Sequence, residues 1–167
     1  MGLFSKKEKN ITTGTQTQRE PATENLVLAR SDVYTDLPSM DKWQAIRLAG
    51  EKLLQKGCIE EPYIEAMLER EKVVTTYLGE GVAIPHGVGA ARSHIKRTGL
   101  VVLQFPEGIA FETGRAYLLI GIAALEDEHM PLLAGIANIM TQEELLTPLL
   151  SSTDPNYIFD CFMEHME

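Results

Sequence analysis

The chain has 167 residues and a net charge of −9, and apolar residues make up 44% of it. This length suits one domain with a tail, and the composition is that of a globular protein rather than a disordered, collagen-like or disulfide-rich one. An acidic chain repels a phosphate backbone, which argues against nucleic-acid binding. No apolar run approaches the ~20 residues that a membrane helix needs, and no secretory signal precedes the domain. We therefore expect no direct membrane insertion.

Charge and cysteine content indicate the charge of a partner and the cellular compartment. The segment Ala116–Glu167 contains no Lys or Arg but nine acidic residues, which would attract a basic partner. The two cysteines, Cys58 and Cys161, form no CxxC pair. Two isolated thiols fit a reducing compartment, so we expect a cytoplasmic protein.

The chain is predicted to divide into a leader and one domain. Residues 1–24 are rich in Thr, Gln and Lys and poor in apolar residues. Such a segment cannot bury enough apolar surface to offset its ordering entropy, so we interpret it as a flexible leader. The domain then covers residues 25–167 and begins with a short apolar strand at Asn25–Leu28.

Helical spacing predicts two helices in the first half of the domain. The first is capped by Ser39, ends at Gly57 and carries Trp43 on its buried face. The second begins near Pro62, a residue suited to the first helical position, and places Arg70 in its last turn.

Four β-prone segments follow these helices. The third of them is expected to end at Pro106, which has no N–H for a strand ladder. The fourth is apolar almost throughout, which is typical of a central strand buried on both faces. The four segments are Thr75–Leu78, Val82–Ile84, Leu100–Phe105 and Tyr117–Ala124.

Three further helices are predicted after the last strand. They span about His129–Met140, about Gln142–Leu150, and a final segment capped by Asp154. Helices before, between and after the strands predict an α/β layered domain whose sheet is covered on both faces.

His86 is the most informative polar residue. It follows the short apolar strand Val82–Ile84 and stands between Pro85 and Gly87. A histidine held at a strand exit, beside a loop, lies where sites form in layered α/β folds. Its imidazole is a competent nucleophile near neutral pH. The alternative is a histidine that only hydrogen-bonds the turn.

Two more residues are candidates for binding an anion. His129 opens a predicted helix, where free N–H groups and the helix dipole favour negative charge; it could instead be a surface turn residue. Arg70 could clamp a phosphate through its guanidinium, or it could simply suit the helix C-terminus and pair with Glu69 or Glu71.

The motifs around these residues resemble a known family. The stretches Met67–Lys72 and Thr76–Gly87, with Arg-Glu-Lys followed by Ala-Ile-Pro-His-Gly, are similar to the mannitol/fructose-type enzyme IIA (EIIA) of the bacterial phosphoenolpyruvate-dependent sugar phosphotransferase system. Thr98–Gly108 and Gly121–His129 resemble its next strand and its second histidine segment. The mannitol branch is the more similar one, and the resemblance covers about residues 25–166.

This resemblance implies a phosphoryl carrier with a mixed parallel/antiparallel sheet of about five strands. The histidine matching His86 takes a phosphoryl group from the carrier HPr and passes it to a cysteine of EIIB, which works with the membrane subunit EIIC. The residues matching His129 and Arg70 line the phosphoryl site. Glu80, six residues before His86, is a further candidate for orienting the imidazole. No cofactor, nucleotide or metal is needed, and the absence of an EIIB-like cysteine loop suggests a stand-alone EIIA.

Two other functions compete with this interpretation. A protein of this fold could sense phosphorylation state and bind target proteins instead of feeding transport. His86 and His129 could also hold a metal ion, although two ligands without a cysteine pair make a poor zinc site.

Overall fold

The protein is an α/β domain in which five strands form one mixed sheet. The computed structural model describes residues 26–166, so the predicted leader at 1–24 lies outside the described residues. The predicted fold class, a mixed sheet with helices on both faces, is confirmed. In chain order the elements are η2 (Arg30–Asp32), β1 (Val33–Tyr34), α1 (Lys42–Lys56), α2 (Pro62–Val73), β2 (Tyr77–Gly79), β3 (Val82–Ala83), η3 (Gly89–His94), β4 (Gly99–Phe111), β5 (Gly114–Ala123), α3 (Glu126–Met140), α4 (Glu143–Ser151) and α5 (Pro155–His165).

The strands are arranged in the order β1-β4-β5-β3-β2. The long strands β4 and β5 pair antiparallel. On the outer sides of this pair, β1 runs parallel to β4 and β3 runs parallel to β5. The short β2 closes the edge, antiparallel to β3. The apolar run predicted as the central strand is β5, whose residues from Leu118 to Ala123 are all buried.

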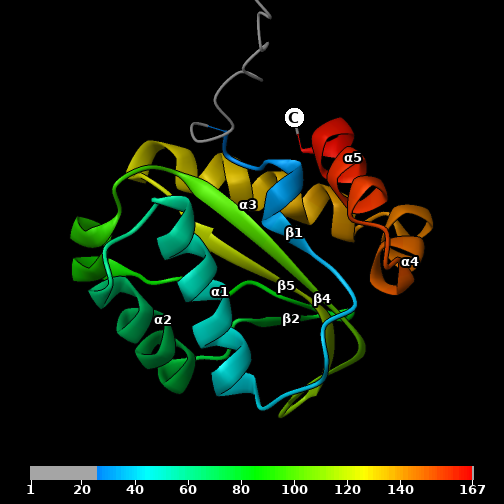
Figure 1. The fold of residues 1–167 in the computed structure, drawn as a ribbon, viewed down its shortest axis with the longest axis horizontal. Coiled ribbons are helices and arrows are strands. Elements are labelled where there is room, and N and C mark those ends of the chain that lie inside the picture. Colours follow the sequence, from blue (N-terminus) through cyan, green and yellow to red (C-terminus); the bar gives the residue numbers. More distant parts are fainter. Residues whose placement is uncertain (1–25, 167) are drawn as a thin grey trace, which may run out of the picture.

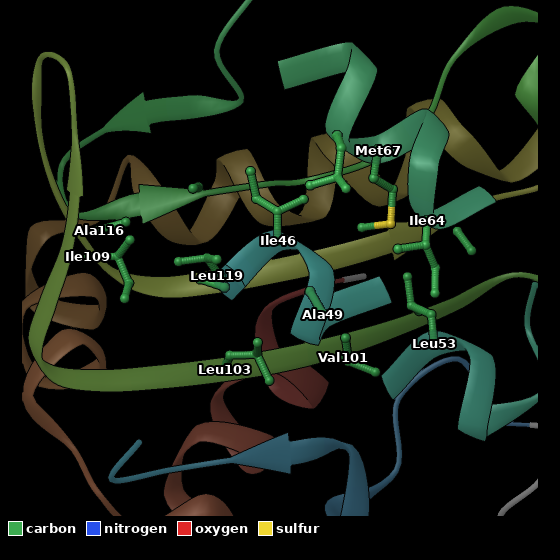
Figure 2. Close-up of a cluster of buried hydrophobic side chains, with 14 of the residues drawn as sticks. Ile46, Ala49, Leu53, Ile64, Met67, Val101, Leu103, Ile109, Ala116 and Leu119 are labelled. Carbon is green, nitrogen blue, oxygen red and sulfur yellow. The ribbon is translucent and has the colours of Figure 1, made fainter. Parts of the chain in front are cut away.

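Helices cover both faces of this sheet (Figure 1). One apolar cluster lies between the sheet and α1 and α2, and a second lies between the sheet and α3, α4 and α5. Figure 2 shows the first cluster, in which α1 and α2 pack on β4 and β5. Each large side chain buried there contributes roughly 1.5–3 kcal/mol. Labelled members are Ile46, Ala49 and Leu53 of α1, Ile64 and Met67 of α2, Val101, Leu103 and Ile109 of β4, and Ala116 and Leu119 of β5.

The ends of α1 follow from local chemistry. The carboxylate of Asp41 accepts the Trp43 amide at 2.9 Å, and the helix ends at Gly57 in the left-handed conformation, as predicted. The prediction that Ser39 caps this helix is wrong, because its hydroxyl donates to the Gly108 carbonyl at 2.7 Å instead. The prediction that Trp43 lies on the buried face of this helix is also wrong, because Trp43 is 36% exposed.

The expected end of β4 at Pro106 is also wrong, since the strand continues to Phe111. The pairing advances from Gln104 to Ile109 on β4 while it moves only from Leu118 to Ala116 on β5. Pro106 lies in this bulge, where no ladder bond needs its missing N–H.

No strand forms at the start of the described chain. The expected strand Asn25–Leu28 is wrong for the described residues Leu26–Leu28, and Asn25 itself lies outside them. The Val27 carbonyl is instead satisfied by the Leu100 amide at 2.8 Å and by the Lys56 ammonium at 2.8 Å.

Candidate functional site

His86 lies just beyond β3, where the chain leaves the sheet. Its position beside β5 is set by a parallel bridge to Ile122, in which the Ile122 amide donates to the Pro85 carbonyl at 3.0 Å. The residue is buried, with 8% of its surface exposed. His86 therefore lies at the exit of a strand, as its position in the sequence predicted.

One ring nitrogen of His86 is already occupied. Nδ1 lies 2.6 Å from the Ile84 carbonyl oxygen. Since a carbonyl can only accept, Nδ1 carries the proton of the neutral ring, and Nε2 keeps its lone pair. The arrangement leaves Nε2 as the nitrogen able to attack an electrophile.

The surroundings keep His86 neutral. Burial lowers the pKa of His86 below its ordinary value, and the bond to Ile84 opposes this effect in part. His129 when protonated, and the permanent charges of Arg70 and Arg92, lower the pKa of His86 further. A neutral imidazole is the nucleophilic form, so this environment suits the histidine to accept a group from a donor.

Folding brings His129, which comes later in the chain, close to His86. The expectation that His129 opens its helix is wrong, because α3 begins at Glu126 and the His129 amide donates to the Leu125 carbonyl at 3.1 Å. The centroids of the two rings are 5.6 Å apart, with the rings tilted by 50°. Burial and the nearby charge of Arg92 lower the pKa of His129 as well. Two neutral imidazoles thus share one site: the single N–H of His86 is bound to the Ile84 carbonyl, whereas a neutral His129 carries one N–H of its own.

Arg70 occupies the last turn of α2, as predicted. One of its guanidinium nitrogens, Nη1, donates to the Val74 carbonyl at 2.6 Å, which anchors the side chain at the helix end. The alternative pairing with neighbouring glutamates does not occur, because Glu69 binds Lys72 and Glu71 binds Lys42. The guanidinium therefore remains available to a ligand, and its charge is felt at His86.

Glu80 is not brought to the site. It lies exposed in the tight turn between β2 and β3, with φ at 53°, at the end of β3 away from His86. Val82 pairs with Leu118 and His86 with Ile122, so the extended chain between the turn and His86 spans roughly 13 Å. The orienting role assigned to Glu80 from the sequence is filled by the Ile84 carbonyl, so that assignment is corrected.

Two functional candidates were missed by the sequence reasoning. Arg92 lies on η3, and its Nη1 is 3.8 Å from the Glu126 carboxylate at the start of α3. Tyr63 of α2 is fully buried, and its hydroxyl accepts from the Gly87 amide at 2.8 Å. Nothing in the spacing of Arg92 marked it, and helical spacing only placed Tyr63 on the same face of its helix as Arg70.

A metal site finds no support in the described part of the chain. Between residues 26 and 166 no three His, Cys, Asp or Glu side chains gather so that they could hold a metal ion.

None of the helices described between residues 26 and 166 is long and apolar enough to cross a membrane.

On this α/β domain, a neutral, tautomerically fixed histidine lies with a second imidazole and near two arginines, an arrangement chemically suited to passing an anionic group through a histidine. Residues 26–165 match the family model described as "Phosphoenolpyruvate-dependent sugar phosphotransferase system, EIIA 2". The chain belongs to this EIIA family and is a phosphotransferase component of that system.

Relatives and a solved structure agree with this assignment. The chain is 44% identical over 132 residues to the mannitol-specific EIICBA component of Pasteurella multocida, covering 77% of this chain and 21% of that protein. It is 35% identical over 139 residues to the mannitol-specific phosphotransferase enzyme IIA component of Bacillus subtilis, covering 83% of this chain and 97% of that protein. The chain thus spans about a fifth of the first of these relatives and nearly all of the second.

One matching solved structure is a complex of mannitol enzyme IIA with phosphorylated enzyme IIB from Escherichia coli. The TM-score is 0.77 at 34% sequence identity, with 82% of this chain and 97% of that chain covered. The fold and the family are therefore supported independently.

Proposed function

We propose that this protein is a phosphoryl carrier for sugar uptake that accepts a phosphoryl group from phospho-HPr on Nε2 of His86. The observation that carries the proposal is the bond from His86 Nδ1 to the Ile84 carbonyl, which leaves Nε2 free on a neutral ring. In a second step the group passes to a cysteine thiolate of EIIB, which serves the membrane subunit EIIC.

Each transfer exchanges one bond to phosphorus for another. The Nε2 lone pair attacks the phosphorus of the donor's phosphohistidine, the donor P–N bond breaks, and the donor imidazole leaves with its electron pair. The thiolate of EIIB then attacks the same phosphorus, and His86 leaves as a neutral ring. Beyond the nucleophile itself, phosphoryl transfer needs mainly alignment and charge compensation, and this site supplies both.

His129 and Arg70 would stabilise the transferred group. His129, whose ring lies 5.6 Å from that of His86, would donate an N–H to a phosphoryl oxygen. Arg70 would offset the negative charge, and a guanidinium suits two phosphoryl oxygens at once. Neither residue has to change its protonation state during transfer.

The surface around the histidines suits a transient partner. Val88, Leu125 and Met130 are 43%, 42% and 68% exposed, and each lies within four residues of His86 or His129 in the chain. Exposed apolar residues around a polar centre are typical of a docking face. We infer that HPr and EIIB use this face in turn, in the cytoplasm.

The proposal is tested by labelling. The full chain is incubated with labelled phosphoenolpyruvate, enzyme I and HPr, alongside His86→Ala and the matched control Glu80→Gln. We expect acid-labile, base-stable label on the wild type and on Glu80→Gln, and none on His86→Ala. An unlabelled wild type, with a working EIIA as positive control, would overturn the carrier function.

The sugar is tested at the second step. Because the relatives from Pasteurella multocida and Bacillus subtilis are named as mannitol-specific, we propose mannitol as the sugar. Labelled protein is mixed with a mannitol-type or a fructose-type EIIB, and discharge is followed over time. Faster discharge to the fructose-type EIIB would contradict the mannitol assignment.

A further inference from the structure

The polypeptide on both sides of His86 is tied to one residue of β5. On the N-terminal side the Pro85 carbonyl accepts the Ile122 amide at 3.0 Å. On the C-terminal side the Gly87 amide donates to the Tyr63 hydroxyl at 2.8 Å, and that hydroxyl donates to the Ile122 carbonyl at 2.8 Å. The Tyr63 oxygen thus stands between an amide and a carbonyl that would otherwise face each other across a parallel ladder.

This tyrosine cannot easily move. It is 1% exposed, and burial raises the pKa of Tyr63 to about 12, so the hydroxyl keeps its proton and can both accept and donate. The loop is fitted to its ring, since a Cβ on Gly87 would lie 2.7 Å from the ring edge. Both partners of the hydroxyl are therefore held at a fixed separation.

We propose that Tyr63 is a positioning residue for His86: its buried hydroxyl spaces the Gly87 amide from the Ile122 carbonyl and so holds the imidazole with Nδ1 on Ile84 and Nε2 open. This inference rests on the proposed phosphoryl transfer at His86. Without the hydroxyl, the buried Gly87 amide would have no partner, which is unfavourable. The parallel bridge of His86 to Ile122 sets the Ile122 carbonyl opposite this amide, and a direct bond between the two would draw the loop towards β5 and turn His86 out of alignment.

The structure supplies a matched control in Tyr77. Its hydroxyl also links a glycine amide to a carbonyl, accepting from Gly81 at 3.4 Å and donating to Arg115 at 3.4 Å. These bonds are longer, and they lie at the far end of β3 from His86. Tyr63→Phe and Tyr77→Phe thus remove the same atom from similar arrangements, but only the first touches the His86 loop.

Two readouts test the proposal on the full chain. The first is the rate of phosphoryl acceptance at saturating phospho-HPr, and the second is the nitrogen NMR signature of the His86 tautomer. For Tyr63→Phe we expect a rate about 10- to 100-fold lower with an unchanged KM, since misalignment of about 1 Å has effects of this size. We also expect a shift from pure Nδ1–H towards a mixture of tautomers. Tyr77→Phe should match the wild type in both.

Other outcomes would overturn the positioning role. A Tyr63→Phe protein with wild-type rate and tautomer would do so, as would a slower rate caused only by a raised KM with the tautomer unchanged. If the wild type itself accepts no phosphoryl group, the proposed function fails, but the NMR signature still decides whether Tyr63 controls the state of His86.

Discussion

At the scale of single residues, the site depends on keeping two imidazoles neutral. Burial is the largest cause of the lowered pKa of both His86 and His129, and nearby cations add to it. An imidazolium at His86 would have no lone pair on Nε2 to accept a phosphoryl group. Burial disfavours the charged imidazolium and so keeps His86 in its nucleophilic form.

This burial predicts how stability depends on pH. Because the pKa of both histidines is lower in the folded chain than the ordinary 6.5, the unfolded chain binds protons first as pH falls. The free energy of unfolding should therefore decrease as pH drops below about 6.5. His86→Gln should flatten this decrease. Urea unfolding at pH 7.5 and 5.5 measures this decrease, with the partly exposed His94→Gln as control; an equal decrease for wild type and His86→Gln would contradict the prediction.

Gly87 provides a second prediction at this scale. A methyl group there would lie 2.7 Å from the buried ring of Tyr63, so the loop must shift. We expect Gly87→Ala to lose about 1–3 kcal/mol, as in other overpacked sites, and to slow phosphoryl acceptance. Gly89→Ala is the control: its left-handed φ costs about 1–2 kcal/mol, but the space around it is open. Equal transfer rates for the two variants would show that crowding at Gly87 does not reach His86.

At the scale of elements, the N-terminal cap of α1 is supplied by Asp41 and not by Ser39, the residue predicted from the sequence. Asp41 accepts the Trp43 amide, while Ser39 donates to the Gly108 carbonyl. We expect Asp41→Ala to lower stability by about 1 kcal/mol through loss of the cap and to reduce helicity by circular dichroism. Ser39→Ala should leave helicity unchanged. A loss of helicity in Ser39→Ala alone would restore the original assignment.

The elements also show why some features were predictable and others were not. The strand exit at His86, the start of α2 at Pro62 and the end of α1 at Gly57 follow from local chemistry, and the structure has them where the sequence places them. Pro106 misled because a bulge, which depends on the partner strand, can accommodate a proline.

The site shows the same division between local and distant causes. His129 and Arg70 carry signals in their own helices, at a start and at an end. Arg92 and the hydroxyl of Tyr63 matter only because folding brings η3 and α2 against the His86 loop, and no local pattern encodes those contacts. The Ile84 carbonyl was missed since every residue has one.

At the scale of the whole molecule, one sheet joins two apolar layers. Neighbouring residues of β5 point to opposite sides, so that Leu119 belongs to the cluster under α1 and α2, and Ile120 to the cluster under α3, α4 and α5. The two histidines of the site come from the sheet and from one of its covering layers: His86 follows β3, and His129 lies on α3. The His86 loop is also tied to Tyr63 of α2, so the 5.6 Å separation of the two rings depends on both layers being packed.

The shared sheet predicts that the two layers unfold together. Ile120→Ala, made on the layer of α3, should lower stability by about 2–5 kcal/mol. The sole tryptophan, Trp43, lies on α1 and reports the opposite layer. If the domain is one cooperative unit, the Trp43 fluorescence transition in urea must shift as far as the circular dichroism transition. Leu119→Ala, on the tryptophan's own layer, provides the comparison. A Trp43 transition left in place by Ile120→Ala would show that the layers unfold separately, and the geometry between His86 and His129 would then depend on a contact between two independent parts.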